Sequence, residues 1–243
     1  KKTFFKFGNP LIPMHLALHA IPTQIALEKK IPLILWGENS ADEYGGDKTF
    51  KGRYMTNKWR KVFGVNEGKT INYWVDKKLK KKDLNPYKLP TNKDMQISKI
   101  KEVFLGYYFE WFPKKIFNIS KKYGFKSATK PKTGYYKFAD IDDEFLITIH
   151  HLMKWYKFGF TREWDNLSLE IRNQKISRQR AIKIISKKGF ILPNQEIDKF
   201  CKYIGIKKKE FMRITDKFRN KKIWRKKKDK WIIKNFLIEN WKW

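Results

Sequence analysis

The stretch that decides the fold reads IPLILWGENSADEYGG and covers residues 31–46. Its first six residues, Ile31 to Trp36, are almost purely apolar, which is typical of a strand buried on both faces in a parallel sheet. A polar loop that contains glycines follows at once. In open α/β sheets, ligands bind where strands end in such loops. The stretch therefore predicts an α/β unit with a candidate site just past its strand.

The sequence on either side of this stretch predicts two domains. Residues 14–29 carry apolar side chains at roughly helical spacing, with Pro22 as a candidate kink, and a helix before a buried strand is half of an α/β unit. Residues 47–90 are mixed, and from about residue 91 the pattern is mainly helical. Helices are expected over 113–124, 140–159, 177–189, 193–203 and 207–218. The expected domains are residues 1–90, which are α/β, and residues 91–243, which are mainly helical.

Composition excludes several classes of protein. Hydrophobic residues make up 41% of the 243 residues and aromatic residues 16%, which is enough apolar surface for a core and excludes a wholly disordered chain. The single cysteine, Cys201, excludes an internal disulfide and a multi-cysteine zinc site within the chain. The longest stretch without charged residues, 7–27, contains three prolines and several polar groups, so no transmembrane segment is expected.

The net charge of +32 raises the question of a nucleic-acid partner. Lysines number 47 and arginines nine, whereas arginine is the preferred residue for bidentate phosphate and base contacts. The enriched residue types are also those that A/T-rich codons supply. We therefore favour solvated lysine-rich faces over a nucleic-acid site. The densest basic run, residues 217–230, could also meet an anionic membrane surface or an acidic partner.

Three carboxylates follow the apolar run, those of Glu38, Asp42 and Glu43. Carboxylates in this place can hold Mg²⁺ against a pyrophosphate, because Mg²⁺ takes one or two carboxylates together with phosphate oxygens. The neighbouring glycines let backbone amides approach an anion. An ordinary acidic turn after a strand is the structural alternative.

The loop resembles the acidic loop of the PP-loop ATP pyrophosphatases, which transfer AMP to a carbonyl oxygen. Most of the chain is similar to the N-acetyl sugar amidotransferases of bacterial surface-polysaccharide biosynthesis, including enzymes of O-antigen and of pseudaminic or legionaminic acid modification. The order and spacing of several segments carry this resemblance. The segments are Gly8-Asn9-Pro10, residues 31–46, Leu105-Gly106-Tyr107-Tyr108, Trp111 before Pro113-Lys114-Lys115, Asp140-Ile141-Asp142-Asp143, residues 150–160, Arg162, Asp165 and Ile171-Arg172.

This resemblance implies part of a PP-loop (HUP-type) parallel sheet, followed by a mainly α-helical C-terminal domain. It also implies a reaction in which ATP adenylates the acetamido oxygen of a sugar, ammonia attacks the same carbon, and AMP leaves an acetamidino group. The implied cofactors are ATP and Mg²⁺, and the implied substrate is an acetamido sugar, either nucleotide-linked or sialic-acid-like. A glutaminase and ammonia-channelling subunits are the implied partners, and the cytoplasm is the expected location.

The resemblance also assigns roles to residues of this chain. Glu38, Asp42 and Glu43 are expected to serve Mg²⁺-pyrophosphate or the adenylated intermediate, with Asp42 as the candidate Mg²⁺ ligand. The expected nucleotide-binding residues are Gly37, Asn39, Ser40, Gly45 and Gly46. The expected substrate-binding residues are His150, His151, Lys154, Lys157, Arg162, Asp165 and Arg172. A solvated basic face or pairing between helices is the structural alternative for the charged members of this second group.

Two pairs of histidines are considered separately. His150 and His151 are adjacent on a predicted helix, so their side chains point about 100° apart, and one is expected to face a site while the other packs. His15 and His19 lie four residues apart, a spacing that metal ligands use, but no third ligand is evident in the sequence. A structural or substrate-facing role is therefore favoured for the second pair. The aromatic residues of the C-terminal region are expected in a core or docking surface.

The chain departs from the family pattern at one important place. The Ser-Gly-Gly-x-Asp-Ser pyrophosphate loop and the cysteine-bearing N-terminal segment of the family are absent from these 243 residues. We therefore expect the chain to be the C-terminal part of an enzyme, cut upstream of Lys1. A PP-loop tRNA-modifying enzyme would share the adenylation chemistry and explain the basic charge. A non-catalytic basic binding or scaffold protein would explain the missing loop.

Overall fold

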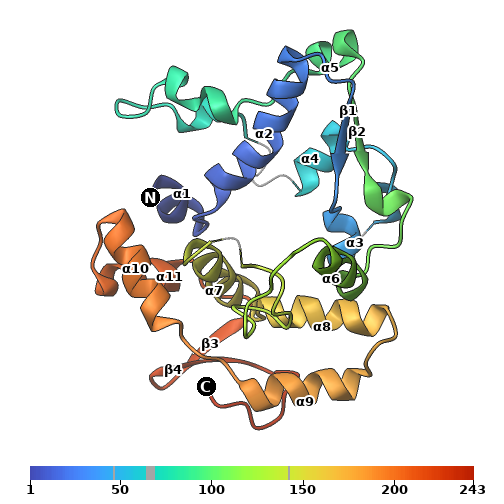
Figure 1. Cartoon of the computed structure of the whole chain (residues 1–243). Helices are drawn as coiled ribbons and strands as arrows, with labels where there is room; N and C mark the ends of the chain where they lie inside the picture. The colour runs from blue at the N-terminus through green and yellow to red at the C-terminus, as the bar shows by residue number, and fades with distance from the viewer. Residues whose placement is uncertain (46, 64–68, 142) are drawn as a thin grey trace. The chain divides into compact units, whose positions relative to one another are not determined.

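The computed structural model describes residues 1–45, 47–63, 69–141 and 143–243. The chain divides into two compact units, whose elements are labelled in Figure 1. The α/β unit is Ile12–Ile119, and the helical unit is Lys1–Leu11 together with Ser120–Trp243. This division differs from the boundary expected near residue 90, because the second strand of the parallel sheet lies beyond that residue.

The α/β unit contains a two-stranded parallel sheet. Strand β1 (Leu33–Trp36) pairs with β2 (Lys101–Phe104) along their whole length, in parallel. Helix α2 (Ile12–Glu28) leads into β1 and continues through Pro22. Between the strands lie α3 (Ser40–Tyr44), η1 (Lys48–Phe50), α4 (Asn57–Phe63), η2 (Ile71–Trp74), η3 (Lys81–Tyr87) and α5 (Asn92–Ser98), and after β2 come η4 (Leu105–Tyr107) and α6 (Pro113–Lys122). The fold is thus helical with a small parallel sheet, while a PP-loop sheet stays a prediction.

The prediction that β1 is buried on both faces is wrong. Leu33 and Leu35 are 46% and 55% exposed, whereas the side chain of Trp36 is half-buried. In the described part of the chain β1 pairs with β2 alone. One face of the strand is therefore open to solvent, although its composition is that of a fully covered strand.

Strand β2 was not predicted, since it begins with the charged pair Lys101 and Glu102. The structure shows how the charge of Glu102 is accommodated at 4% exposure. Its two carboxylate oxygens accept a hydrogen bond from Trp36 Nε1 at 2.9 Å and an ion-paired one from Arg60 at 2.5 Å. A paired acid is one of the few ways to bury a charge in a strand, and a sequence pattern does not reveal the pairing. Nearby aromatic packing of Trp59 and Phe104 completes the core of this unit.

The helical unit contains four helices that the sequence predicts after residue 140: α7 (Leu146–Phe158), α9 (Arg178–Lys188), α10 (Asn194–Ile204) and α11 (Lys208–Lys217). Two further helices, α1 (Lys2–Phe7) and α8 (Arg162–Arg172), were not predicted. Ser177 caps α9 by accepting a hydrogen bond from the amide of Arg180, as expected, and Gly189 ends that helix. Helix α7 begins later than predicted, because Asp143 precedes it and accepts a hydrogen bond from the amide of Ile147. Asp142 lies outside the described residues.

Helix α7 is the centre of the core of the helical unit. Ile149 and Met153 are 0% and 1% exposed, and Phe200 and Phe211 of α10 and α11 pack in the same cluster. Phe4 of α1 joins it, with its ring stacked on that of Phe211 at 5.4 Å. Gly8 ends α1 at φ 55°, and a Cβ there would lie 2.8 Å from the side chains of Met153 and Phe218. A glycine is therefore required at this position by both conformation and space.

An antiparallel hairpin, β3 (Trp224–Lys227) and β4 (Lys230–Ile233), follows α11 and was not predicted. It is attached through Arg219, whose guanidinium lies 4.4 Å, 4.7 Å and 4.9 Å from the rings of Tyr156, Trp224 and Trp231. Stacking of a guanidinium on aromatic faces is favourable when the cation is desolvated. The prediction that the C-terminal aromatics belong to a core is confirmed for Trp224, Trp231, Phe236, Trp241 and Trp243.

No helix in the described ranges is both long enough and apolar enough to cross a membrane.

The first testable prediction concerns His19 of the α/β unit. Its ring lies 5.2 Å from Trp36 and 5.9 Å from Trp59, and burial, aided by the charges of Arg60 and His15, lowers the pKa of His19 to about 4. In the unfolded chain the pKa is about 6.5. The stability that depends on a neutral ring is therefore complete above about pH 6.5 and is lost as the pH falls toward 4. The gap between the pKa values corresponds to about 3 kcal/mol.

We expect the free energy of unfolding to fall more steeply between these two pH values in the wild type than in His19→Phe. Proton NMR of the histidine rings gives the pKa directly. A His19 ring that titrates near its unfolded value would contradict the prediction.

Candidate functional site

The carboxyl ends of β1 and β2 lie at the same edge of the sheet, because the strands are parallel. Gly37 follows β1 and begins the acidic loop, while Leu105 and Gly106 follow β2 in η4. The side chain of Asp42 in α3 reaches across to this second segment. A Cβ on Gly106 would lie 2.9 Å from Oδ2 of Asp42. The structure thus joins two segments, 31–46 and 105–108, that are far apart in the sequence.

The side chain of Asp42 is partly buried but still accessible to solvent. It is 22% exposed, and Lys51 Nζ lies 3.8 Å from Oδ1. Burial raises the pKa of Asp42, and the charge of Lys51 opposes that effect. A Cβ added at Gly37 or Gly45 would meet nothing within 4 Å, so the backbone on both sides of α3 is open to a ligand. A carboxylate in such a place fits one Mg²⁺ ligand among phosphate oxygens.

Asn39 has a structural task in the same loop. It is 2% exposed, and its Oδ1 accepts hydrogen bonds from the amide of Ala41 at 3.0 Å and from Trp59 Nε1 at 2.9 Å. Its Nδ2 donates to the carbonyl of Phe50 at 3.0 Å. A direct contact between Asn39 and a nucleotide would have to replace one of these bonds. The side chain instead fixes the loop that carries Asp42.

The other predicted loop residues have varied surroundings. Glu38 is exposed, and Ser40 and Glu43 are half-buried. Gly45 has φ 79°, which favours glycine, and Gly46 lies outside the described residues. In the described part of the chain no three His, Cys, Asp or Glu side chains gather as a metal site. A Mg²⁺ ion held mainly by phosphate oxygens does not need such a group.

In the helical unit the two adjacent histidines diverge, as their positions on α7 predict. Nδ1 of His150 lies 3.0 Å from Oδ1 of Asn9, and Nδ1 of His151 lies 2.8 Å from Oγ1 of Thr133. His151 faces a cavity and is 8% exposed. The contact of His150 brings the Gly8-Asn9-Pro10 segment of the sequence onto α7.

The predicted basic residues of α7 and α8 are engaged within the unit. Lys154 forms an ion pair with Asp165, and Lys157 donates a hydrogen bond to the carbonyl of Phe7. Arg162 lies 3.1 Å from Asp140 and 4.0 Å from Asp165. Arg172 is exposed at the last turn of α8. The structure therefore brings together Lys154, Arg162 and Asp165. For Lys154 and Asp165 it shows the structural alternative that the sequence left open, an ion pair between helices α7 and α8.

A cavity of about 300 Å³ lies beside these residues, and we call it the α7–α8 cavity. Its polar lining includes Lys132, Thr133, Thr148, His151, Arg162 and Glu163. Its apolar lining is formed by Leu152, Phe190, Ile191 and Pro193. Burial raises the pKa of Glu163, and Lys188 at 3.2 Å opposes that effect.

Sequence reasoning missed Thr133, Thr148, Glu163 and Lys188. Helix α8 buries polar residues at helical spacing, Glu163, Asn166 and Glu170. Such a stripe has the periodicity of an ordinary solvent face, and only the structure shows that it faces inward.

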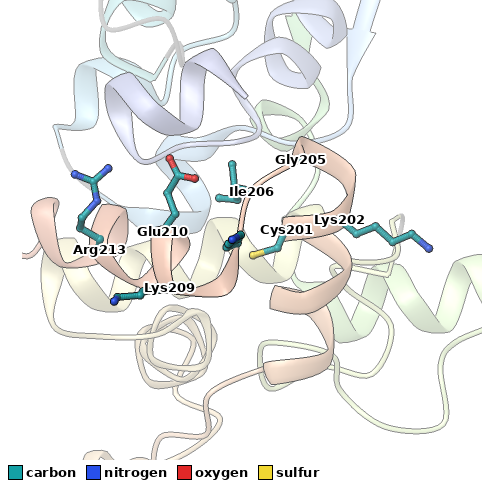
Figure 2. A pocket seen from close by; sticks show the side chains of 8 residues that line it. Cys201, Lys202, Gly205, Ile206, Lys209, Glu210 and Arg213 are labelled. Carbon is teal, nitrogen blue, oxygen red and sulfur yellow. The ribbon is translucent and has the colours of Figure 1, made fainter.

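A second, more open groove lies along α10 and α11 and is shown in Figure 2. The side chains of Lys202, Lys209 and Arg213 extend in different directions there rather than toward one point. Burial raises the pKa of the Cys201 thiol, so this cysteine is not an activated nucleophile. The α7–α8 cavity and the edge that carries Asp42 are therefore the better candidate sites.

Comparison with known families gives a match within the helical unit. Residues 132–237 match the model of the LPS biosynthesis protein WbpG-like, C-terminal domain. The comparison with curated proteins finds no match. The matched range includes α7 to β4 and every residue that lines the α7–α8 cavity. This match supports an LPS biosynthesis WbpG-like family for the chain, through its C-terminal portion.

The second prediction concerns the buried pair of Lys154 and Asp165, whose side chains are 16% and 11% exposed. Burial raises the pKa of Asp165 more than Lys154 lowers it. Asp165→Asn leaves an ammonium without its carboxylate in this environment. We expect a loss of about 3–5 kcal/mol in the free energy of unfolding, measured by urea denaturation.

Two further variants make this test specific. Glu144→Gln breaks an exposed pair with Lys199, which solvent screens, and should change the free energy of unfolding far less than Asp165→Asn does. Lys154→Met with Asp165→Leu removes both charges and should recover most of the lost stability. Equal losses in Asp165→Asn and Glu144→Gln would contradict the prediction.

Proposed function

We propose that this chain is part of an ATP-dependent amidotransferase that converts the N-acetyl group of a sugar to an acetamidino group in polysaccharide biosynthesis. The match of residues 132–237 to the WbpG-like domain carries the role in polysaccharide biosynthesis. The resemblance of residues 31–46 to the acidic loop of PP-loop enzymes supports the reaction. The close approach of the Asp42 carboxylate to Gly106 supports it further, since it gathers two family-like segments at one edge.

The proposed reaction solves a chemical problem. An acetamide carbon is a poor electrophile, and its oxygen is a poor leaving group. In the first step the amide oxygen attacks the α-phosphorus of ATP, an O–P bond forms, and pyrophosphate leaves. In the second step ammonia attacks the activated carbon, the bond from that carbon to the adenylated oxygen breaks, and AMP leaves with a proton released. Positioning of two substrates and neutralisation of phosphate charge are the main tasks of the protein.

Residues of this chain fit part of these tasks. ATP supplies the leaving group and Mg²⁺ neutralises phosphate charge when they are bound. Asp42 would hold the ion, and the loop fixed by Asn39 would set the position of that carboxylate. The open backbone at Gly37 and Gly45 would admit the phosphates. Because the Ser-Gly-Gly-x-Asp-Ser motif is absent from these residues, we assign adenylation to the full-length protein, in the cytoplasm, with an ammonia-supplying glutaminase as its partner.

The third prediction tests the role of Asp42 in the full-length protein. Asp42→Asn keeps the shape of the side chain but removes the charge, so sugar-dependent pyrophosphate release should fall by about 10² or more. Asp47→Asn is the matched control, since that exposed aspartate lies in the next turn and accepts a hydrogen bond from the amide of Thr49. Release at the wild-type rate in Asp42→Asn would remove the loop from the chemistry.

The fourth prediction concerns Gly106. In Gly106→Ala the new methyl group would lie 2.9 Å from Oδ2 of Asp42, so the carboxylate has to move. We expect pyrophosphate release to fall by about tenfold while the circular dichroism spectrum is kept. Gly52→Ala is the control, because its methyl group would meet only the carbonyl of Thr49 at 3.9 Å. Equal activity in both variants would show that the position of Asp42 is unimportant.

A further inference from the structure

We propose that one face of the β3–β4 hairpin docks on an anionic membrane surface, through the headgroups of acidic phospholipids. The hairpin, labelled in Figure 1, lies at the end of the basic run of residues 217–230. Nine of these 14 residues are lysine or arginine, and one is acidic. The proposed function leaves this run without a role, since none of its residues lines the α7–α8 cavity or belongs to the loop of Asp42.

The register of the hairpin determines which side chains form its exposed face. Residues directly opposite each other share a face, and the faces alternate along a strand. Trp224 is 3% exposed and pairs with Ile233, and both pack in the core of the helical unit, so this pair marks the inner face. The alternate pairs form the outer face, and they are Arg225 with Ile232 and Lys227 with Lys230.

The cations of the outer face carry charge that the chain does not neutralise. Arg225, Lys227 and Lys230 are exposed, and none of them forms an ion pair in the described part of the chain. Lys227 and Lys230 stand directly opposite each other, and like charges in that arrangement destabilise a pair of strands. An anionic surface laid against the outer face would relieve this repulsion.

The hairpin is fixed to the helical unit through its inner face, so the outer face is preformed. The guanidinium of Arg219 lies 4.7 Å and 4.9 Å from the rings of Trp224 and Trp231. Trp224 also meets Trp155 of α7 edge to face, with ring centroids 5.1 Å apart. Because this backbone is already ordered, binding through the outer face costs little conformational entropy.

The composition of the outer face favours a lipid surface over a nucleic acid. Single strands bind on exposed aromatic rings, whereas Trp224 and Trp231 both pack in the core on the inner face. The outer face has one arginine and no asparagine or glutamine, the residues that read base edges with two hydrogen bonds. Lysines are attracted by the negative potential of a membrane without a fixed geometry. Ile232, half-buried among the cations, adds an apolar contact.

Co-sedimentation of the 243-residue chain with lipid vesicles tests the proposal. One set of vesicles contains about 30% phosphatidylglycerol in phosphatidylcholine, and the other contains phosphatidylcholine alone. We expect binding to the anionic set alone, and weaker binding at about 300 mM than at about 50 mM salt. Replacement of Arg225, Lys227 and Lys230 together by glutamine, which we call the hairpin variant, should weaken this binding by about tenfold or more.

A matched control removes the same charges from another surface of the same unit. Arg180, Lys183 and Lys187 are exposed on one side of α9, and they are also one arginine and two lysines. Their replacement by glutamine, the α9 variant, should weaken binding by no more than about threefold, because charges outside the contact are screened. Near-ultraviolet circular dichroism of the tryptophans should be the same in both variants and the wild type.

Two single substitutions separate the proposed role from a structural one. Lys227→Gln removes the repulsion with Lys230, so it should weaken vesicle binding by about threefold without lowering the free energy of unfolding. Arg225→Lys should bind vesicles within about twofold of the wild type, because the attraction depends on charge and not on the planar guanidinium.

Several results would overturn the proposal. Equal losses in the hairpin and α9 variants would show that the overall charge of the chain drives binding. Absence of binding to the anionic vesicles, or equal binding to both sets, would exclude this partner. Tighter binding to a DNA duplex of about 20 base pairs, lost in the hairpin variant alone, would assign the face to a nucleic acid. Since the assay contains neither sugar nor ATP, its result does not depend on the proposed reaction.

Discussion

The helical unit depends on the burial of a polar face of α8. Glu163, Asn166 and Glu170 are 6%, 3% and 0% exposed, and each is bonded to a residue outside the helix. Glu170 accepts a hydrogen bond from the hydroxyl of Tyr136, Oδ1 of Asn166 accepts one from the amide of Tyr135, and Glu163 pairs with Lys188 of α9. These bonds attach the segment before α7, which contains Thr133, and α9 to the same helix. The α7–α8 cavity takes its walls from these elements, so its shape follows from the polar face.

A buried polar face of this kind specifies one folded arrangement more than it adds to the free energy of unfolding. Moving charges out of water costs several kcal/mol per ion, and the attraction within each pair only partly offsets that cost. The raised pKa values of Asp165 and Glu163 have this cause, since burial exceeds the effect of the nearby lysines. The arrangement tolerates little change of geometry: a Cβ on Gly134 would lie 2.2 Å from Oδ1 of Asn166. This packing therefore fixes one position of the loop that contains Gly134 against α8.

Sequence reasoning recovered the parts of the structure that local chemistry determines. Ser177, Gly189 and Gly159 mark helix ends through capping and positive backbone φ angles, and these depend on neighbours within a few residues. The divergence of His150 and His151 follows from helical geometry alone. Strand β2 and the inward face of α8 were missed, because burial of Glu102 or Glu163 depends on a partner that is distant in the sequence. The exposure of Leu33 and Leu35 was missed for the complementary reason, since composition does not say which neighbours a strand has.

The two candidate sites also differ in whether nearby residues in the sequence reveal them. Asp42 could be found from the sequence because a run of carboxylates and glycines after an apolar strand is a local pattern, and the contribution of Gly106 is the part that needed the fold. The α7–α8 cavity has no local pattern, since Glu163 stands among ordinary surface-like residues of α8. The overall charge of +32 does not show which cations are available to a partner. Arg162 and Lys188 have carboxylates beside them, whereas the cations on the outer face of the β3–β4 hairpin form no ion pair in the described part of the chain. The pairing of charges at each surface, and not their total, therefore has to be known before a partner can be inferred.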